Sequence, residues 1–357
     1  MPSKSRLGNW ILGLMPRPAE DFRSRSQNDS LRTDLGLLST PKGGASVVPY
    51  IKIARLDHWF KNVFLLPGAA VVVFQQPELW DMLFVGRLTL AVLVAGIIAS
   101  SNYVLNEVRD GPQDAHHPVK KDRPVPSGKV NARVAYVEWL ALAIVGLALS
   151  LLFGGWFFVV ALAFWCMGCV YNAPPARSKE IPYLDVLSES ANNPLRLLLG
   201  WYATGTSLAP SLSLVLAWWM LGAFFMAVKR FAEYRKIDNP ERAARYRRSF
   251  AYYNEERLLV SITYYAVAFG MFLGIFIIRY HMELLLAVPF IAGFIAYYIH
   301  LGYMKDSPVQ YPERLYKRTL FMAYIGFCVF VLIALIFVDI PALNEAFGPS
   351  LPVHETF

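Results

Sequence analysis

The chain has 357 residues, of which 56% are hydrophobic and 17% are charged, and its formal net charge is +8. A soluble globular domain carries about 25% charged residues, so this composition excludes an ordinary soluble protein and indicates one that crosses a membrane several times. In such a protein a basic excess reports the orientation of the loops, and we expect no nucleic acid partner.

Long apolar runs divide the chain between residues 62 and 338. Each run is close to the length of about 20 residues that a helix needs to cross the hydrocarbon core. We therefore predict an all-α polytopic membrane bundle of nine transmembrane helices, at residues 62–78, 83–105, 133–153, 156–172, 184–204, 210–228, 258–278, 284–303 and 319–338. The fifth segment fits least well, because it contains Asp185, Glu189 and Arg196.

Lysine and arginine are concentrated in alternate connections between these segments. The connections after the second, fourth, sixth and eighth segments are basic, whereas the others are nearly free of both residues. The positive-inside rule then places the N-terminus and the basic connections in the cytoplasm and the C-terminus outside. Residues 1–48 are predicted to be disordered or to lie on the membrane surface, residues 49–340 to form the membrane domain, and residues 341–357 to be a short extracytoplasmic tail.

The second apolar segment ends in an acidic stretch, NEVRDGPQD. Asn106, Asp110 and Asp114 are four residues apart, so on a continuous helix they drift by only about 80° and form one polar stripe. An amide and two carboxylates suit Mg²⁺, which usually binds one or two carboxylates together with substrate phosphates. Pro112, with Gly111 before it, predicts that the helix breaks after Asp110 and restarts with Asp114.

Further polar groups collect at the other predicted cytoplasmic ends. Acids that hold Mg²⁺ and bases that hold phosphate, gathered on one side of a membrane, predict a site for a diphosphate and its metal. The candidate substrate-binding residues are Lys61, Asn62, Lys120, Arg123, Tyr171, Arg177, Lys179, Asp185, Glu189, Arg196, Lys229, Arg230 and Glu233. Cys166 and Cys169 form a CxxC within an apolar helix and are predicted to be small buried hydrophobic residues.

The nine segments, the NxxxDxxxD stretch that starts at Asn106, and "YN…ARSK" at 171–179 together resemble the UbiA superfamily of intramembrane prenyltransferases. Four stretches are most similar to one branch, the polyprenyl-phosphate (decaprenyl-phosphate) phosphoribosyltransferases of bacterial cell-envelope synthesis. They are RLDHWFKNVFLLP, NEVRDGPQDAHHPVKKDRPVPSG, VKRFAE and YRRSFAYYNEERL. Glu107 departs from that branch, which has Asp there. Other branches carry DxxxD after the sixth helix, where this chain has Glu233 and Asp238 at a different spacing.

This resemblance implies an enzyme of the bacterial cytoplasmic membrane. Its Mg²⁺-dependent reaction would transfer a 5-phosphoribosyl group from phosphoribosyl pyrophosphate to a polyprenyl phosphate at the cytoplasmic face. The lipid tail would lie along the bundle, in contact with membrane lipid, and a homo-oligomer is left open. Asp110 and Asp114 would hold the metal. Phosphates would be clamped by Lys61, Arg123, Lys229 and Arg230.

Two alternatives remain open at this point. The first is a UbiA-type prenyltransferase that joins a prenyl diphosphate to an aromatic or other acceptor. The second is a transporter with an ion site at the helix breaks. Transporters usually bind near the bilayer midplane, whereas the polar groups here gather at one face, which favours an enzyme.

Overall fold

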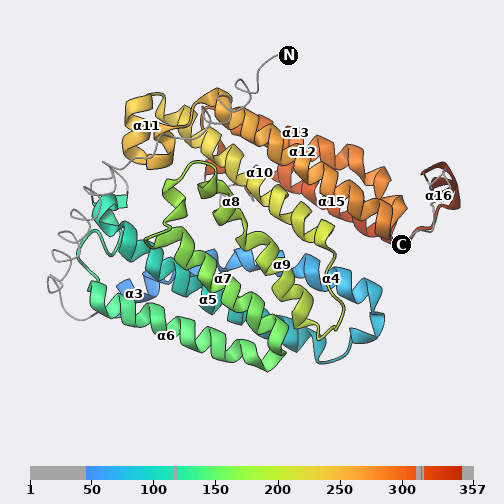
Figure 1. Ribbon diagram of the computed structural model, residues 1–357, viewed down its shortest axis with the longest axis horizontal. Coiled ribbons are helices and arrows are strands. Elements are labelled where there is room, and N and C mark those ends of the chain that lie inside the picture. Colours follow the sequence, from blue (N-terminus) through green and yellow to red (C-terminus); the bar gives the residue numbers. More distant parts are fainter. Residues whose placement is uncertain (1–45, 116–119, 311–314, 316, 348–357) are drawn as a thin grey trace, which may run out of the picture.

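The computed structural model describes residues 46–115, 120–310, 315 and 317–347, and all regular structure within them is helical. The long helices run side by side (Figure 1). The α-helices are α3 (Val48–Ile53), α4 (Leu66–Gln75), α5 (Phe84–Asp114), α6 (Ala132–Ser150), α7 (Gly155–Asn172), α8 (Leu184–Ser190), α9 (Asn192–Ala203), α10 (Leu212–Ile237), α11 (Pro240–Tyr246), α12 (Glu255–Tyr280), α13 (Val288–Tyr303), α15 (Thr319–Ile336) and α16 (Pro341–Phe347). Short 3₁₀ helices connect them: η1 (Leu56–Leu65), η2 (Pro77–Leu79), η3 (Lys120–Asp122), η4 (Leu151–Phe153), η5 (Ser178–Glu180), η6 (Arg248–Ala251), η7 (Met282–Ala287) and η8 (Pro308–Gln310).

Seven helices within the described residues are long and apolar enough to cross a membrane. The all-helical bundle is confirmed, but seven rather than nine of the predicted segments form a single long helix. The two exceptions are the first and fifth predicted segments. Residues 62–78 are divided between η1 and α4, and residues 184–204 between α8 and α9. The polar residues of the fifth segment had already marked it as unusual. In the first segment, Pro67 lies in the first turn of α4, directly after the break.

The two broken segments cross each other at very close range. A Cβ atom added to Gly68 of α4 would lie 2.0 Å from the carbonyl oxygen of Leu197 in α9, and one added to Gly200 would lie 1.9 Å from that of Leu65. Both distances are far below van der Waals contact, so the backbones meet where side chains usually intervene. This crossing brings the polar ends of the two segments together.

Helix α5 does not break at Pro112. It continues from Phe84 to Asp114 with this proline inside its last turns, which corrects the predicted interruption. A proline so close to the C-terminal end removes a single backbone donor. The preceding Gly111 has no Cβ to clash with the proline ring. A Cβ at Gly111 would also lie 2.7 Å from Cγ1 of Val125.

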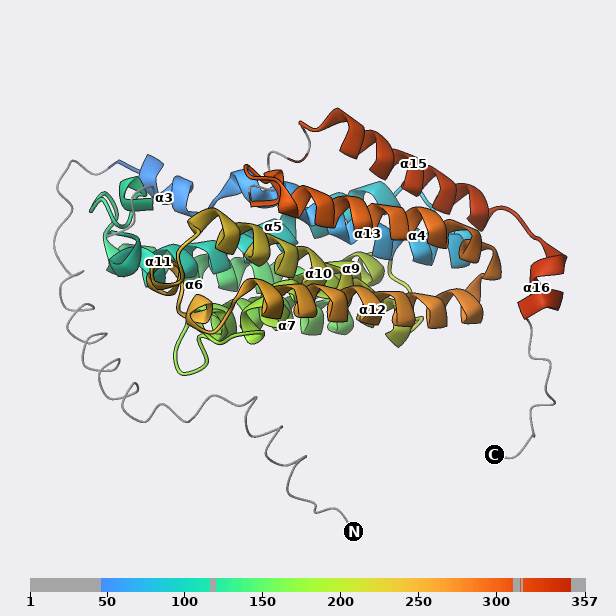
Figure 2. The same ribbon diagram turned by 90° about the horizontal axis from the view of Figure 1, so that it is seen from above.

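Two of the four hydrophobic clusters among the described residues contain the most buried side chains. One joins α5, α7 and α9 around Ile98, Phe157 and Leu199, and the other joins α10, α12 and α13 around Phe224 and Ile262. Helix α15 packs against α13 and η7 at the edge of the bundle, with only Phe321 buried, as Figure 2 shows from above. Exposed apolar surface of this kind faces lipid in a membrane protein.

Two smaller predictions have different outcomes. Cys166 is exposed on α7 and Cys169 is only partly buried, so the prediction that both are buried is wrong. The tails at 1–48 and 341–357 lie largely outside the described residues, and within them α3 begins at Val48 and α16 covers Pro341–Phe347. The proposed character of these tails stays a prediction.

Candidate active site

The C-terminal ends of α5 and α7 are joined by Lys179, which the short helix η5 carries. Its ammonium Nζ donates to Oδ1 of Asn106 at 3.2 Å, to Oδ1 of Asn172 at 3.1 Å, and to Oδ1 of Asp110. The residue is only 6% exposed. Burial outweighs the neighbouring Asp110 carboxylate and lowers the pKa of Lys179 to about 8. Two of the predicted metal ligands, Asn106 and Asp110, therefore contact the same cation, Lys179. Asn172 also contacts it, and this residue was not predicted from the sequence although it lies in the YN motif.

The third predicted metal ligand faces a different partner. Oδ2 of Asp114 accepts from Nη1 of Arg123 at 2.9 Å, and the same nitrogen lies 3.5 Å from Oε2 of Glu107. Residues seven apart on a helix lie nearly above one another, so Glu107 and Asp114 form a second stripe beside that of Asn106 and Asp110. The predicted single stripe is thus two neighbouring ones.

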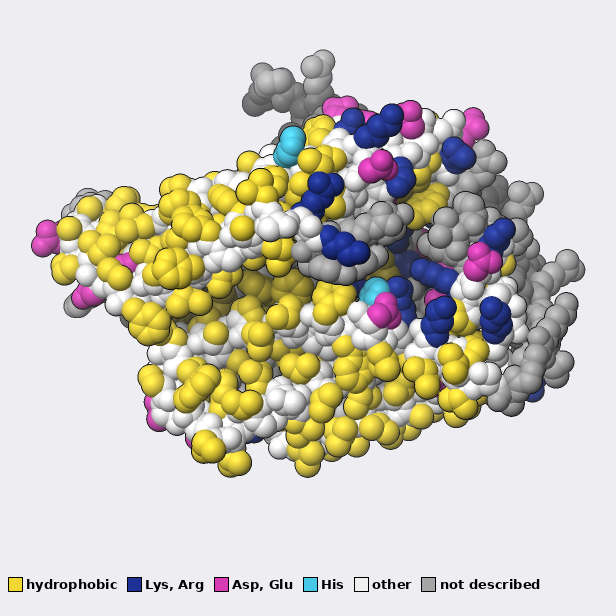
Figure 3. Space-filling model, turned by 180° about the vertical axis from the view of Figure 1, so that it is seen from behind, with side chains coloured by type: hydrophobic (Ala, Val, Ile, Leu, Met, Phe, Trp, Pro, Cys, Tyr) yellow, Lys and Arg dark blue, Asp and Glu magenta, His cyan; other side chains and the backbone are white. Residues whose placement is uncertain are grey.

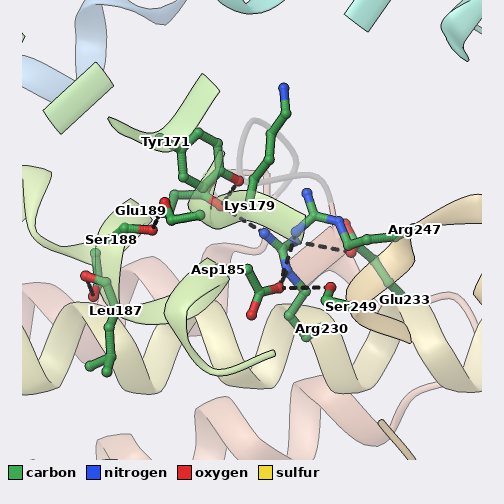
Figure 4. A network of polar contacts seen from close by, with 12 residues as sticks. Tyr171, Lys179, Asp185, Leu187, Ser188, Glu189, Arg230, Glu233, Arg247 and Ser249 are labelled. Atoms are coloured by element: carbon green, nitrogen blue, oxygen red, sulfur yellow. Dashed lines mark hydrogen bonds and ion pairs between the residues drawn. The ribbon is translucent and has the colours of Figure 1, made fainter. Parts of the chain in front are cut away.

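A second cluster centres on Arg230 of α10, which is 2% exposed (Figure 4). Its Nε donates to Oδ2 of Asp185 at 3.2 Å, its Nη2 to Oε2 of Glu189 at 2.7 Å, and its Nη1 to Oε2 of Glu233 at 3.1 Å. The hydroxyl of Tyr171 donates to the same Glu189 oxygen at 2.8 Å. Arg230 therefore holds three carboxylates, and this geometry favours a positioning role over the direct phosphate contact expected from the sequence.

Asp185 is fully buried and accepts hydrogen bonds from a segment that contains none of the predicted site residues. Arg247 Nη1 and Ser249 Oγ each donate to its Oδ2 at 3.2 Å, and the hydroxyl of Tyr253 donates to its Oδ1 at 2.7 Å. All three lie in the YRRSFAYYNEERL stretch that carried the resemblance. Their contacts depend on chain folding between α10 and α12, which spacing alone does not reveal.

Arg196 lies deeper in the bundle, at the crossing of the two broken segments. Its Nε donates to Oδ1 of Asn62 at 3.1 Å, and its guanidinium carbon lies 4.8 Å from the ring centroid of Phe164. A charge-assisted hydrogen bond and an aromatic face together stabilise a guanidinium that is only 6% exposed. The candidate residues Asn62 and Arg196 are thus in direct contact.

Basic side chains surround the remaining space of this end. Burial, followed by the charges of Lys229 and Arg196, lowers the pKa of Lys61 to about 8. Lys61 Nζ lies 3.1 Å from Nδ1 of His58, and Arg55 Nη2 lies 2.6 Å from Nε2 of the same ring. Figure 3 shows Lys and Arg side chains around a hollow at one end of the molecule, while hydrophobic side chains cover most of the rest of that face. Such a group of cations favours an anionic ligand.

The oxygen donors on α5 are compatible with Mg²⁺. Asn106 and Asp110 of α5, together with Asn172 of α7, already direct side-chain oxygens at a cation. Glu107 Oε1 is buried without a hydrogen-bond partner in the described part of the chain. No group of three His, Cys, Asp or Glu residues that could hold a metal occurs among the described residues. Mg²⁺ needs no such group, because one or two carboxylates and substrate phosphates usually suffice.

The candidate residues thus form two carboxylate groups and a basic group at one end of the bundle. Arg177 joins the first group, since its Nη2 lies 3.5 Å from Oδ1 of Asp110. The charge of Lys229 helps to lower the pKa of Lys61. The side chain of Lys120 lies outside the described residues.

Solved structures and characterised proteins resemble this chain. A UbiA homolog from Archaeoglobus fulgidus bound to GPP and Mg²⁺ superposes with a TM-score of 0.59 over 81% of this chain and all of that one, at 19% identity, which shows a shared fold. Decaprenyl-phosphate phosphoribosyltransferase of Corynebacterium glutamicum is 33% identical over 192 residues, 51% of this chain and 54% of the relative. The enzyme of that name from Mycolicibacterium smegmatis is 28% identical over 62% of this chain and 69% of its own length.

The match to the Corynebacterium relative thus spans about half of that protein's length. A digeranylgeranylglyceryl phosphate synthase of Saccharolobus solfataricus is 34% identical over 128 residues, 36% of this chain and 43% of that enzyme. The model of the UbiA prenyltransferase family matches residues 63–325, a range that contains most of the candidate site. The fold, the polar ends of its helices and this match agree, and the chain belongs to the UbiA prenyltransferase family of integral membrane proteins.

Proposed function

We propose that this protein transfers a 5-phosphoribosyl group from phosphoribosyl pyrophosphate to a polyprenyl phosphate, in a reaction that requires Mg²⁺. Membership of the UbiA family supports a membrane transferase and argues against the transporter alternative. The names of the relatives from Corynebacterium and Mycolicibacterium support the choice of reaction. The product, a polyprenyl-phosphoryl-phosphoribose, would serve cell-envelope glycan synthesis.

One observation in the structure carries the choice of donor. Arg230 binds Glu189, Glu233 and Asp185, so the carboxylates near the end of α10 already neutralise a guanidinium. A prenyl diphosphate with several metal ions would favour acids free to bind metal in both motifs, and here the second set is committed to Arg230. The neighbouring Lys229 and Lys61 instead suit a donor with an additional phosphate, such as the 5-phosphate of the sugar.

The chain's own residues would bind and orient both substrates. Asn106, Asp110 and Asp114 would hold Mg²⁺, which when bound offsets the charge of the leaving diphosphate. Lys61 and Lys229 would bind the sugar phosphate, and Arg123 and Arg177 lie beside the carboxylates where the diphosphate would sit. Arg230 and Arg247 would position Glu189, Glu233 and Asp185, and through them the ends of α8 and α10.

The transfer itself needs little proton chemistry. An oxygen of the acceptor phosphate forms a bond to the anomeric carbon, while the bond from that carbon to the diphosphate oxygen breaks and its electron pair leaves with the diphosphate. The attacking group is already an anion, so no strong general base is required. The side chains therefore act by alignment and charge stabilisation.

A prenyl diphosphate donor is the second candidate, favoured by the similarity to the digeranylgeranylglyceryl phosphate synthase. Purified full-length protein should be incubated with radiolabelled phosphoribosyl pyrophosphate and a polyprenyl phosphate, with and without Mg²⁺. We expect a labelled lipid product only when all three are present, and none with Asp110→Asn. Consumption of geranyl diphosphate without any use of the sugar donor would replace this proposal with the second candidate.

The membrane orientation is part of the proposal. The candidate site lies at the basic end of the bundle, and the positive-inside rule assigns that end to the cytoplasm. Phosphoribosyl pyrophosphate is a soluble and highly charged donor, so a cytoplasmic site is the one that it reaches without crossing the membrane.

A further inference from the structure

The ammonium of Lys179 lies in a position with the ligand chemistry of a metal site. Three side-chain oxygens converge on it: Oδ1 of Asn106 and Oδ1 of Asn172, at 3.2 and 3.1 Å, and Oδ1 of Asp110. They come from two different helices, α5 and α7, and the lysine arrives from η5. Amide and carboxylate oxygens are the ligands that Mg²⁺ prefers, so a side-chain cation lies where these oxygens would hold a metal ion.

The lysine and a metal ion cannot share these oxygens closely. Mg²⁺ binds its oxygen ligands at about 2.0–2.1 Å, so a metal on Asp110 would bring a double positive charge into direct contact with the ammonium. Water screens such repulsion poorly here, because Lys179 is 6% exposed. A metal ion on these oxygens would therefore compete with the ammonium of Lys179 for Oδ1 of Asp110.

The surroundings of Lys179 hold the backbone of its turn in place. Arg177, which precedes η5, has a φ of 33°, and its Nε donates to Oε1 of Glu180 at 2.6 Å. Ser178 Oγ donates to Ser188 Oγ at 2.7 Å. The four-carbon stem of lysine has freely rotating bonds and ends in a compact charge. Its ammonium can therefore move from the oxygens to an anion bound beside them without movement of the turn.

We propose that Lys179 is an internal placeholder for the metal. In the free protein its ammonium neutralises Asp110 and fills the oxygen site. An incoming diphosphate draws the ammonium away and at the same time supplies oxygens for Mg²⁺, so the metal and the diphosphate bind together. This inference rests on the metal assignment of the proposed function and adds an order of events to it. Lys179 acts here as a positioning residue.

Metal binding without turnover tests the inference. Mn²⁺ binding to the purified full-length protein should be measured by electron paramagnetic resonance, with and without inorganic pyrophosphate. Wild-type protein should bind Mn²⁺ weakly alone and at least about tenfold more tightly with pyrophosphate. Lys179→Met, which keeps the stem and removes the charge, should bind Mn²⁺ alone at least about tenfold more tightly than wild type, and pyrophosphate should add less.

The matched control is Lys236→Met, in a lysine that pairs with Asp306 at 3.9 Å on the surface, and its Mn²⁺ affinity should equal that of wild type. A Lys179→Met protein that binds Mn²⁺ no more tightly than wild type would overturn the inference and leave the proposed function standing. Tight binding of Mn²⁺ to wild type without pyrophosphate would overturn it too, even if the variant does not fold. Unchanged Mn²⁺ affinity with pyrophosphate in Asp110→Asn would overturn the metal assignment itself.

Discussion

Nε of Arg230 donates to Oδ2 of Asp185 at 3.2 Å, and both residues are almost completely excluded from solvent. The pair connects α8 to α10, and Arg247 extends the connection to the segment that precedes α12. Removing one partner of such a buried network leaves the remaining buried charges with less compensation.

Asp185→Ala should therefore destabilise the protein strongly. Arg230 and Arg247 would both lose a carboxylate, and breaking a buried ion pair in this way costs about 3–5 kcal/mol. The free energy of unfolding, from chemical denaturation in detergent micelles, measures the change. Asp306→Ala is the control, because its carboxylate is 92% exposed and its loss should change stability by no more than about 0.5 kcal/mol. Equal losses in both variants would show that the network adds nothing particular.

If Asp110 and Asp114 bind the metal, Asp110→Asn and Asp114→Asn should each lose a ligand. Both variants should be far less active but still folded. A metal ion supplies several kcal/mol of charge stabilisation in the transition state, so kcat should fall by at least about 100-fold. Initial rates at saturating substrate measure the loss, and circular dichroism verifies the fold. Asp57→Asn is a suitable comparison, since this carboxylate is 71% exposed and carries no proposed role. Near wild-type turnover in both variants would refute the metal assignment.

Lys229→Ala should affect one substrate more than the other. A charge-assisted phosphate contact contributes about 1.5–3 kcal/mol, so its loss should raise the KM for phosphoribosyl pyrophosphate by about ten- to a hundredfold. The KM for the polyprenyl phosphate should change much less. Steady-state kinetics with each substrate varied in turn separates the two constants. If neither constant moves, Lys229 only reports membrane orientation, and if both rise equally it does not distinguish the donor.

The pH dependence of kcat/KM should report Lys61. Burial and the neighbouring cations lower the pKa of Lys61 to about 8, so the free enzyme loses this positive charge as the pH rises through about 8. Phosphate binding needs the charged form, and kcat/KM should therefore fall on the alkaline side of that value. Lys61→Arg keeps its charge and should move the decline to higher pH. A profile that is identical in wild type and variant would assign the decline to another group.

Membrane orientation can be tested with single cysteines in a variant that lacks Cys166, Cys169 and Cys328. Ser127→Cys and Ser207→Cys place thiols at exposed positions near opposite ends of the bundle. A membrane-impermeant maleimide should label the first only from the cytoplasmic side and the second only from outside. Labelling of Ser127→Cys from outside would contradict the proposed location of the site.

Much of this arrangement follows from local patterns in the sequence. The seven long helices coincide with apolar runs of sufficient length, and the acidic end of α5 and the basic connections lie where the sequence indicates. These features depend on composition within about 20 residues, which hydropathy reads directly. The break in the first segment is also local, because Pro67 lies in the first turn of α4 and lacks the backbone N–H of a helix interior. The close approach of Gly68 to Leu197 is a long-range contact, which hydropathy does not reveal.

Long-range pairing explains the other differences. Asp110 pairs with Lys179, whereas Asp114 pairs with Arg123. These pairings depend on where the connections that carry Lys179 and Arg123 fold back onto α5, and the spacing of residues along α5 does not predict this. The same holds for Arg247, which reaches Asp185 across 62 residues of chain. The predicted break at Pro112 was wrong because proline disrupts the interior of a helix, whereas Pro112 lies in the final turns of α5.

The short helices at the Gly68 and Gly200 crossing also bear on how the newly made chain enters the bilayer. Helix α4 has 10 residues and α9 has 12, so at 1.5 Å per residue each extends only about 15 or 18 Å by itself, against a hydrocarbon core of about 30 Å. Each therefore needs the adjoining η1 or α8 to span the core. The second of them also follows Asp185 and Glu189 and contains Arg196, groups that are costly to place in lipid alone. Neither segment is suited to leave the translocon by itself. We expect the segment at 184–204 to be retained until α10 supplies Arg230, so that membrane integration and assembly of the polar network become the same event.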